Sequence, residues 1–139
     1  MKVLVVDDDA TARELLSSEL TEAGYESISL PSPIGVTRFV QEHDIEVVII
    51  DVVMPSLSGD RLAKLLRGNP KFAKLVVILV SGESERELQH LSSVVGADAV
   101  ISKGDIRGKL ATTVKAAVLA RATKSAEAPR SAGSPGSRK

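Results

Sequence analysis

The 139-residue chain is long enough for one domain with a single core and too short for two ordinary domains. Aromatic residues make up only 2%, so aliphatic side chains must fill the core, and a base-stacking platform for single-stranded nucleic acid is disfavoured. The absence of cysteine excludes a disulfide framework and a thiolate metal site. The net charge is zero, but residues 121–139 carry five bases and one acid, which leaves the preceding part mildly acidic.

The chain opens with a short apolar run over residues 3–6 that predicts a β-strand and stops at the three aspartates 7–9. This run is far too short for a signal peptide or a membrane span, so we expect a cytoplasmic protein. A helix follows, with Thr11 and Glu14 at the spacing of a capping box and Gly24 as its C-terminal stop.

Two further strands can be distinguished by their burial patterns. Residues 27–30 alternate between serine and aliphatic side chains, which is typical of a half-exposed edge strand. Ser32 and Pro33 are expected to cap and begin the second helix. Four consecutive β-branched residues, 47–50, predict a strand buried on both faces that ends at Asp51.

The second half continues the alternation of strands and helices. The expected elements are a helix ended by Gly68, an apolar strand over 75–80 ended by Ser81, a helix ended by Gly96, a brief strand over 99–101 followed by Lys103, and a long helix capped by Asp105. From Ala122 the apolar periodicity is lost, so residues 122–139 are predicted to be a disordered basic tail rich in Ala, Ser, Pro and Gly.

Five strands alternating with five helices predict an α/β fold, a doubly wound parallel sheet with right-handed crossovers. The second strand is half polar, whereas the third and fourth are fully apolar. That difference favours the strand order 2-1-3-4-5 of the flavodoxin-like (βα)5 arrangement.

The carboxyl ends of parallel strands meet at one edge of the sheet, so we expect five polar residues to converge there: Asp7, Asp8, Asp51, Ser81 and Lys103. Three carboxylates in one crevice repel each other unless their pKa values rise or a cation binds. An all-oxygen acidic site suits Mg²⁺, and a lysine opposite it could clamp a phosphoryl group on Asp51. Simple turn formation is the alternative for single residues, and Asp9 is as readily a helix cap.

At these positions the chain resembles the response-regulator receiver domain of two-component signalling, within the CheY-like superfamily. The resemblance covers Lys2 to about Arg121 and rests on four motifs in order: VLVVDDD, IIDVVMPSLSG, LVSG and GADAVISK. It implies a receiver domain over residues 1–121.

The resemblance also implies a role for each site residue. Asp51 would be the phosphoacceptor and Asp8 a direct Mg²⁺ ligand, with Asp7 a ligand mainly through water. The backbone carbonyl of Val53 would be another ligand, while Ser81 and Lys103 would contact the phosphoryl group. The donor would be a phosphohistidine on a histidine kinase or phosphotransfer protein.

Three positions depart from the family pattern. Val100 stands where the family usually has Tyr or Phe, so the usual aromatic readout cannot operate. Gly104 replaces the usual proline after the lysine, and a non-proline cis bond would cost roughly 2.5–4 kcal/mol. Pro33 stands where glycine is common. These changes leave the phosphorylation chemistry intact and affect signal transmission.

The first functional hypothesis is a stand-alone receiver, a protein–protein interaction switch with self-phosphorylation and autodephosphorylation as its only reactions. Its unknown target would bind the fourth helix, fifth strand and fifth helix, with no role for nucleic acid. The alternative is a pseudo-receiver that binds a protein without phosphorylation. A phosphohydrolase is disfavoured because Val53 occupies the position of the second acid, and an FMN-binding flavodoxin because the first loop is acidic.

Overall fold

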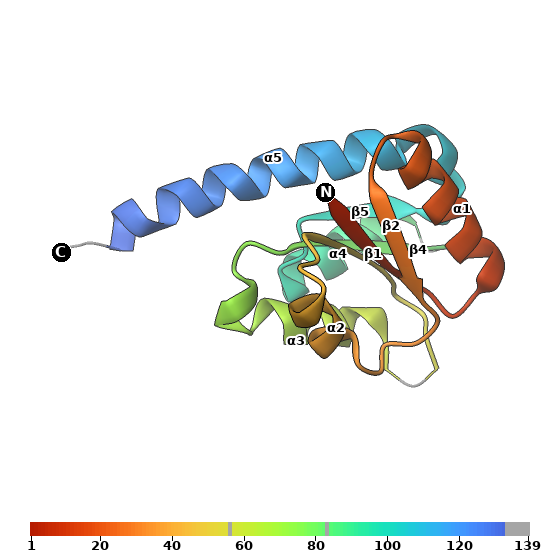
Figure 1. Ribbon diagram of the computed structural model, residues 1–139, viewed down its shortest axis with the longest axis horizontal. Helices are drawn as coiled ribbons and strands as arrows, with labels where there is room; N and C mark the ends of the chain where they lie inside the picture. Colours follow the sequence, from red (N-terminus) through yellow and green to blue (C-terminus); the bar gives the residue numbers. More distant parts are fainter. Residues whose placement is uncertain (56, 83, 133–139) are drawn as a thin grey trace.

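A computed structural model describes residues 1–55, 57–82 and 84–132. Its centre is a parallel sheet of five strands in the order β2-β1-β3-β4-β5, which confirms the predicted flavodoxin-like topology (Figure 1). The strands are β1 (Lys2–Val6), β2 (Glu26–Leu30), β3 (Val47–Asp51), β4 (Val76–Ser81) and β5 (Ala99–Ser102).

Helices cover both faces of the sheet. The helices are α1 (Ala10–Glu22), α2 (Val36–Glu42), α3 (Gly59–Arg67), α4 (Glu85–Val95) and α5 (Ile106–Ala132), with short 3₁₀ turns at Pro70–Phe72 and Lys103–Asp105. Helices α1 and α5 pack on one face, while α2, α3 and α4 pack on the other (Figure 1). This is the doubly wound arrangement that parallel strands require.

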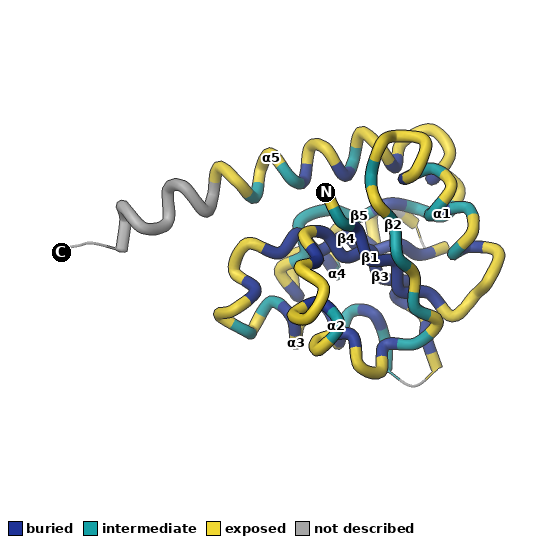
Figure 2. Tube along the Cα trace, in the orientation of Figure 1, coloured by how far each residue is buried: buried dark blue, intermediate teal, exposed yellow. Residues whose placement is uncertain are grey.

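The core consists of two layers because successive strand residues point to opposite faces. In β1, Val3 and Val5 contact the layer of α1 and α5, whereas Leu4 and Val6 contact the layer of α2, α3 and α4. All of β3 is buried, as predicted from its unbroken apolar run. Figure 2 shows the buried sheet enclosed by helices whose outer sides are exposed.

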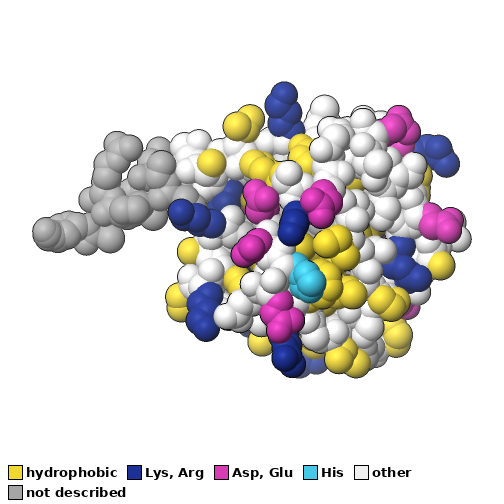
Figure 3. Space-filling model, viewed as in Figure 1, with side chains coloured by type: hydrophobic (Ala, Val, Ile, Leu, Met, Phe, Trp, Pro, Cys, Tyr) yellow, Lys and Arg dark blue, Asp and Glu magenta, His cyan; other side chains and the backbone are white. Residues whose placement is uncertain are grey.

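The edge strand β2 is only partly buried, in agreement with its alternating sequence. The side chains of Ile28 and Leu30 contact the core layer of α2. Just before α2, the side chain of Ile34 is 77% exposed, and Figure 3 shows apolar side chains on the surface in this region.

The cap of α1 confirms the interpretation of Asp9 as a helix cap. Asp9, not Thr11, is the N-cap: its backbone is extended (φ −92°) and its Oδ2 accepts from the backbone N–H of Ala12 at 3.1 Å. Thr11 lies inside the helix. A carboxylate directly ahead of the helix caps the free N–H groups of the first turn, so the capping-box interpretation of Thr11 was wrong.

Helix α2 starts later than predicted. Ser32 accepts a hydrogen bond from the Ile34 N–H at 3.2 Å, within a turn that precedes the helix. Gly35 then adopts a left-handed conformation (φ 81°), and the helix begins at Val36. The assignment of Pro33 as the first helical residue was wrong, because the side chain of Ser32 stabilises a local turn instead.

Helix α5 is longer than predicted. It continues beyond Arg121 to Ala132 and projects past the sheet (Figure 1). The disordered basic tail expected over residues 122–139 stays a prediction, and residues 133–139 lie outside the described part. None of the described helices is both long and apolar enough to cross a membrane.

A buried ionic network joins elements at the amino-terminal edge of the sheet. The Asp98 side chain, 5% exposed, precedes β5. Its Oδ2 accepts from the Val77 N–H and the Arg67 Nη2, both at 2.8 Å. Its Oδ1 accepts from Arg121 Nε at 2.8 Å and Nη2 at 2.6 Å. One carboxylate therefore connects α3, β4 and α5.

We predict that Asp98→Ala lowers the free energy of unfolding by about 3–5 kcal/mol, because two partly buried guanidinium groups lose their counter-ion. Urea denaturation followed by circular dichroism measures this loss. The exposed Arg38–Glu42 pair, 3.1 Å apart, provides the control, and Arg38→Ala should change stability by no more than about 0.5 kcal/mol. Equal effects of the two substitutions would contradict the importance of the network.

Candidate functional site

Strand register brings the predicted site residues to one edge of the sheet. In the parallel ladders Val6 pairs with Ile50, Asp51 with Val80, and Ser81 with Ser102. Asp7, Asp51, Ser81 and Lys103 therefore lie at or just beyond the carboxyl ends of four adjacent strands. Segments more than fifty residues apart in sequence meet here because parallel strands all end on the same side.

Three carboxylates form the centre of this site. Asp7, Asp8 and Asp51 each offer one oxygen, and these oxygens lie within 4.8 Å of one another. Asp7 is fully buried and Asp51 is 4% exposed, whereas Asp8 lies on the surface. Three oxygen ligands at this spacing, open to solvent on one side, can hold a hard divalent cation such as Mg²⁺.

Asp7 is fixed in place on one side and lacks a hydrogen bond on the other. Its Oδ1 accepts from the Asp9 N–H at 2.9 Å, and its carbonyl oxygen accepts from Arg13 Nη1 at 2.8 Å. Its buried Oδ2 has no hydrogen-bond partner among the described residues, and the Lys103 Nζ lies 3.6 Å away. A buried acceptor without a partner is costly, so the Oδ2 is suited to a bound cation.

Asp51 is electrostatically strained at the end of β3. Burial, and then the charge of Asp7, raise its pKa from 3.8 to about 6, although the Lys103 ammonium and the Val53 N–H oppose the rise. The Lys103 Nζ lies 3.5 Å from Oδ2, and the Val53 N–H donates to Oδ1 at 3.4 Å. The carboxylate is therefore ionised at neutral pH at a free-energy cost that a cation would relieve.

Lys103 provides the fixed positive charge of the site. Burial by itself lowers the pKa of this lysine, but the charges of Asp51 and Asp7 outweigh that effect and raise it. The side chain is one-third exposed, and its ammonium contacts both carboxylates. It therefore stays protonated and faces the position that an anionic group on Asp51 would occupy.

Gly59 allows the chain to turn back against Asp51. Its N–H donates to the Val52 carbonyl at 2.8 Å. A Cβ at this position would collide with the Asp51 carbonyl oxygen and would lie 2.8 Å from the Val52 Cα. Only glycine permits this close backbone approach. The sequence indicated a turn here. It did not indicate that Gly59 packs directly against the backbone of Asp51 and Val52 at the end of β3.

Two other predicted residues lie nearby without a demonstrated role. Ser81 is buried at the end of β4, next to the end of β3. Val53 is 66% exposed, and the proposed ligand role of its carbonyl remains a prediction. Sequence reasoning missed Arg13, which holds the Asp7 carbonyl, because its position in α1 carries no motif.

Fold and site together define a signalling domain whose central feature is a carboxylate beside a cation site and a lysine. The family model of the response regulator receiver domain matches residues 3–115. The chain belongs to this family, and therefore to the phosphoacceptor proteins of two-component signalling rather than to the enzymes.

Individual relatives agree with this assignment. A probable chemotaxis protein CheY of Rhizobium etli is 31% identical over 117 residues, which cover 84% of this chain and 91% of that protein. The transcriptional regulatory protein GltR of Pseudomonas aeruginosa is 28% identical over 114 residues, covering 82% of this chain. These residues span 47% of GltR, so the chain matches about half of that relative.

Solved structures show the same fold. The response regulator TrrA of Thermotoga maritima, in complex with Mg²⁺-BeF, has a TM-score of 0.73 and 30% identity, with 84% of this chain and 97% of that chain covered. Chemotaxis protein CheY4 of Vibrio cholerae has a TM-score of 0.76 and 27% identity, with the same shares covered.

The raised pKa of Asp51 predicts a pH-dependent effect on stability in EDTA. The folded state binds the Asp51 proton more tightly than the unfolded chain, so this residue destabilises the fold above about pH 6 and not below pH 3.8. Asp51→Asn should therefore raise the free energy of unfolding by on the order of 1–2 kcal/mol at about pH 8. Urea denaturation at several pH values measures the difference, which should shrink between about pH 6 and pH 4. A constant difference would contradict the prediction.

Proposed function

We propose that the chain is a stand-alone receiver that accepts a phosphoryl group on Asp51 from a histidine kinase or phosphotransfer protein in the cytoplasm. The observation that carries this proposal is the Asp51 carboxylate itself, buried among two further acids with the Lys103 ammonium 3.5 Å away. The near-complete coverage of a single-domain-sized CheY relative supports the stand-alone interpretation.

In the transfer step, an Asp51 carboxylate oxygen attacks the phosphorus of the phosphohistidine. The new P–O bond forms as the P–N bond breaks, and the imidazole keeps the electron pair and takes up a proton. Lys103 remains protonated and pairs with the charge that arrives on Asp51. A Mg²⁺ ion held by Asp7, Asp8, Asp51 and the Val53 carbonyl would neutralise charge on the phosphoryl oxygens.

Phosphorylation would then change the contacts of neighbouring elements. In this proposal the Ser81 hydroxyl and the Lys103 ammonium contact phosphoryl oxygens, which favours a second arrangement of β4 and α4. Val100 of β5 packs against the core layer that includes Leu88 and Val95 of α4. A valine cannot act as an aromatic rotamer switch, so the signal would pass through this aliphatic contact to a protein bound on α4, β5 and α5.

A second candidate function is a pseudo-receiver that binds its partner without phosphorylation. Val100 and Gly104 favour it, because both replace residues that the family uses to transmit the phosphorylated state. Lys103 and Gly104 belong to a 3₁₀ turn that leads into α5. The two candidates share one site and differ in whether Asp51 is modified.

Incubation with Mg²⁺ and a small phosphodonor such as phosphoramidate distinguishes the two candidates. We expect an acid-stable, base-labile adduct on Asp51, detected by mass spectrometry, because the carboxylate is positioned for attack. Asp51→Asn should abolish the adduct, whereas Asp60→Asn, at the start of α3, should retain it. Absence of the adduct in the parent protein would favour the pseudo-receiver.

Saturating Mg²⁺ is expected to raise the melting temperature, since it binds the folded acidic cluster and not the unfolded chain. Scanning calorimetry with Mg²⁺ or with EDTA measures this rise. The free energy of unfolding should increase by about 2.7 kcal/mol when the Mg²⁺ concentration is a hundredfold above the dissociation constant. Asp8→Ala should remove it. Asp9→Ser keeps a capping side chain and should retain the increment; an unchanged response in Asp8→Ala would place the ion elsewhere.

A further inference from the structure

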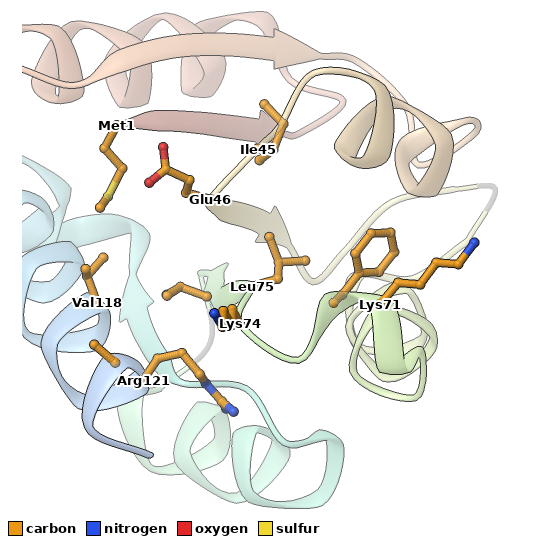
Figure 4. Close-up of a pocket in the computed structure, with 11 residues that line it drawn as sticks. Met1, Ile45, Glu46, Lys71, Lys74, Leu75, Val118 and Arg121 are labelled. Atoms are coloured by element: carbon orange, nitrogen blue, oxygen red, sulfur yellow. The ribbon is translucent and has the colours of Figure 1, made fainter. Parts of the chain in front are cut away.

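A cavity of about 590 Å³ lies at the amino-terminal edge of the sheet. It is bounded by the segments that lead into β3 and β4 and by α5 (Figure 4). The acid cluster lies at the carboxyl ends of the same strands, so the cavity is separate from the phosphorylation site. Its apolar lining includes Met1, Ile45, Phe72, Leu75, Val118 and Ala122. Volume and apolar lining are those of small-molecule sites.

The charges around this cavity are unbalanced. Its lining contains Lys71, Lys74 and Arg121 but a single acid, Glu46. Glu46 lies with Met1 on one wall, Arg121 comes from α5 on the facing wall, and Lys74 lies between them, while Lys71 extends away from the cavity (Figure 4). The electrostatic potential inside therefore favours an anion.

The charge of Arg121 is part of an ionic network behind the cavity wall. Arg121 and Arg67 share one carboxylate, that of Asp98, so this network carries one uncompensated positive charge. Both arginine side chains are less than one-fifth exposed, which limits screening by solvent. Burial, and then the charge of Arg121, lower the pKa of Arg67 although Asp98 opposes them.

Unused hydrogen-bond donors accompany this charge. Asp98 engages the Nε and Nη2 of Arg121, and within the described ranges no protein acceptor contacts its Nη1. The ammonium of Lys74 likewise has no protein acceptor among the described residues. Both residues line the cavity, and charge-assisted hydrogen bonds to an anion are stronger than neutral ones.

We propose that the cavity binds a small amphipathic organic acid, a single carboxylate on an apolar body. The apolar part would lie against Ile45, Leu75 and Val118, with the carboxylate toward Lys74 and Arg121. Such a ligand would connect α5 to the segments before β3 and β4 and would stabilise the attachment of this helix. The binding site is independent of phosphorylation of Asp51.

Decanoate is a suitable probe for this site on the full chain. Titration followed by ¹H–¹⁵N NMR should give saturable shifts at the amides of residues 45–46, 74–76 and 118–122. The matched cation decyltrimethylammonium should bind several-fold more weakly, and salt should weaken decanoate binding. Equal binding of the two probes, or shifts confined to other residues, would overturn the proposal. Shifts at these residues on dilution without ligand would also overturn it, since they indicate a second copy.

Paired variants test the cavity and its charge separately. Ala122→Trp should fill the cavity and abolish binding, whereas Ala120→Trp, on an exposed position outside the lining, should bind like the parent. Lys74→Glu should weaken decanoate roughly threefold to tenfold, and the exposed Lys64→Glu, with the same change in net charge, should not. Circular dichroism verifies folding. Parent-like affinity in Ala122→Trp or in Lys74→Glu would overturn the proposal.

Discussion

Repulsion among carboxylates that are held together out of solvent is the constraint on which this structure depends. Asp51 ends β3 and Asp7 directly follows the adjacent strand β1, so the sheet holds the two carboxylates close together. One lysine contacts both, and the pKa of Asp51 is still raised to about 6. Carboxylate repulsion therefore destabilises the folded state at this edge of the sheet. Binding of a cation or transfer of a phosphoryl group to Asp51 would change this repulsion.

At the amino-terminal edge of the same sheet, positively charged side chains outnumber negatively charged ones. There two arginines share one buried aspartate, and a cavity with a basic lining opens beside them. Helix α5 contributes to both regions, because it starts just after Lys103 and carries Arg121 further on.

Several features could be predicted from the sequence because their signals are local. Alternating or continuous apolar runs predict the strands and their burial. The residues that follow the strands predict which side chains meet at the carboxyl edge of the sheet. That is why the strand order and the convergence of Asp7, Asp8, Asp51 and Lys103 could be expected without coordinates. The order of four short motifs pointed to the family for the same reason.

Other features depend on contacts between distant segments, and only the tertiary structure decided them. Asp98 meets Arg67 and Arg121 across 31 and 23 residues, and no sequence periodicity links such partners. Gly59 is required by the close approach of another backbone. The sequence by itself determined the elements and the chemistry at their ends, while three-dimensional packing decided the distances, the pKa values and the cavity, because these depend on which charges and surfaces are neighbours in space.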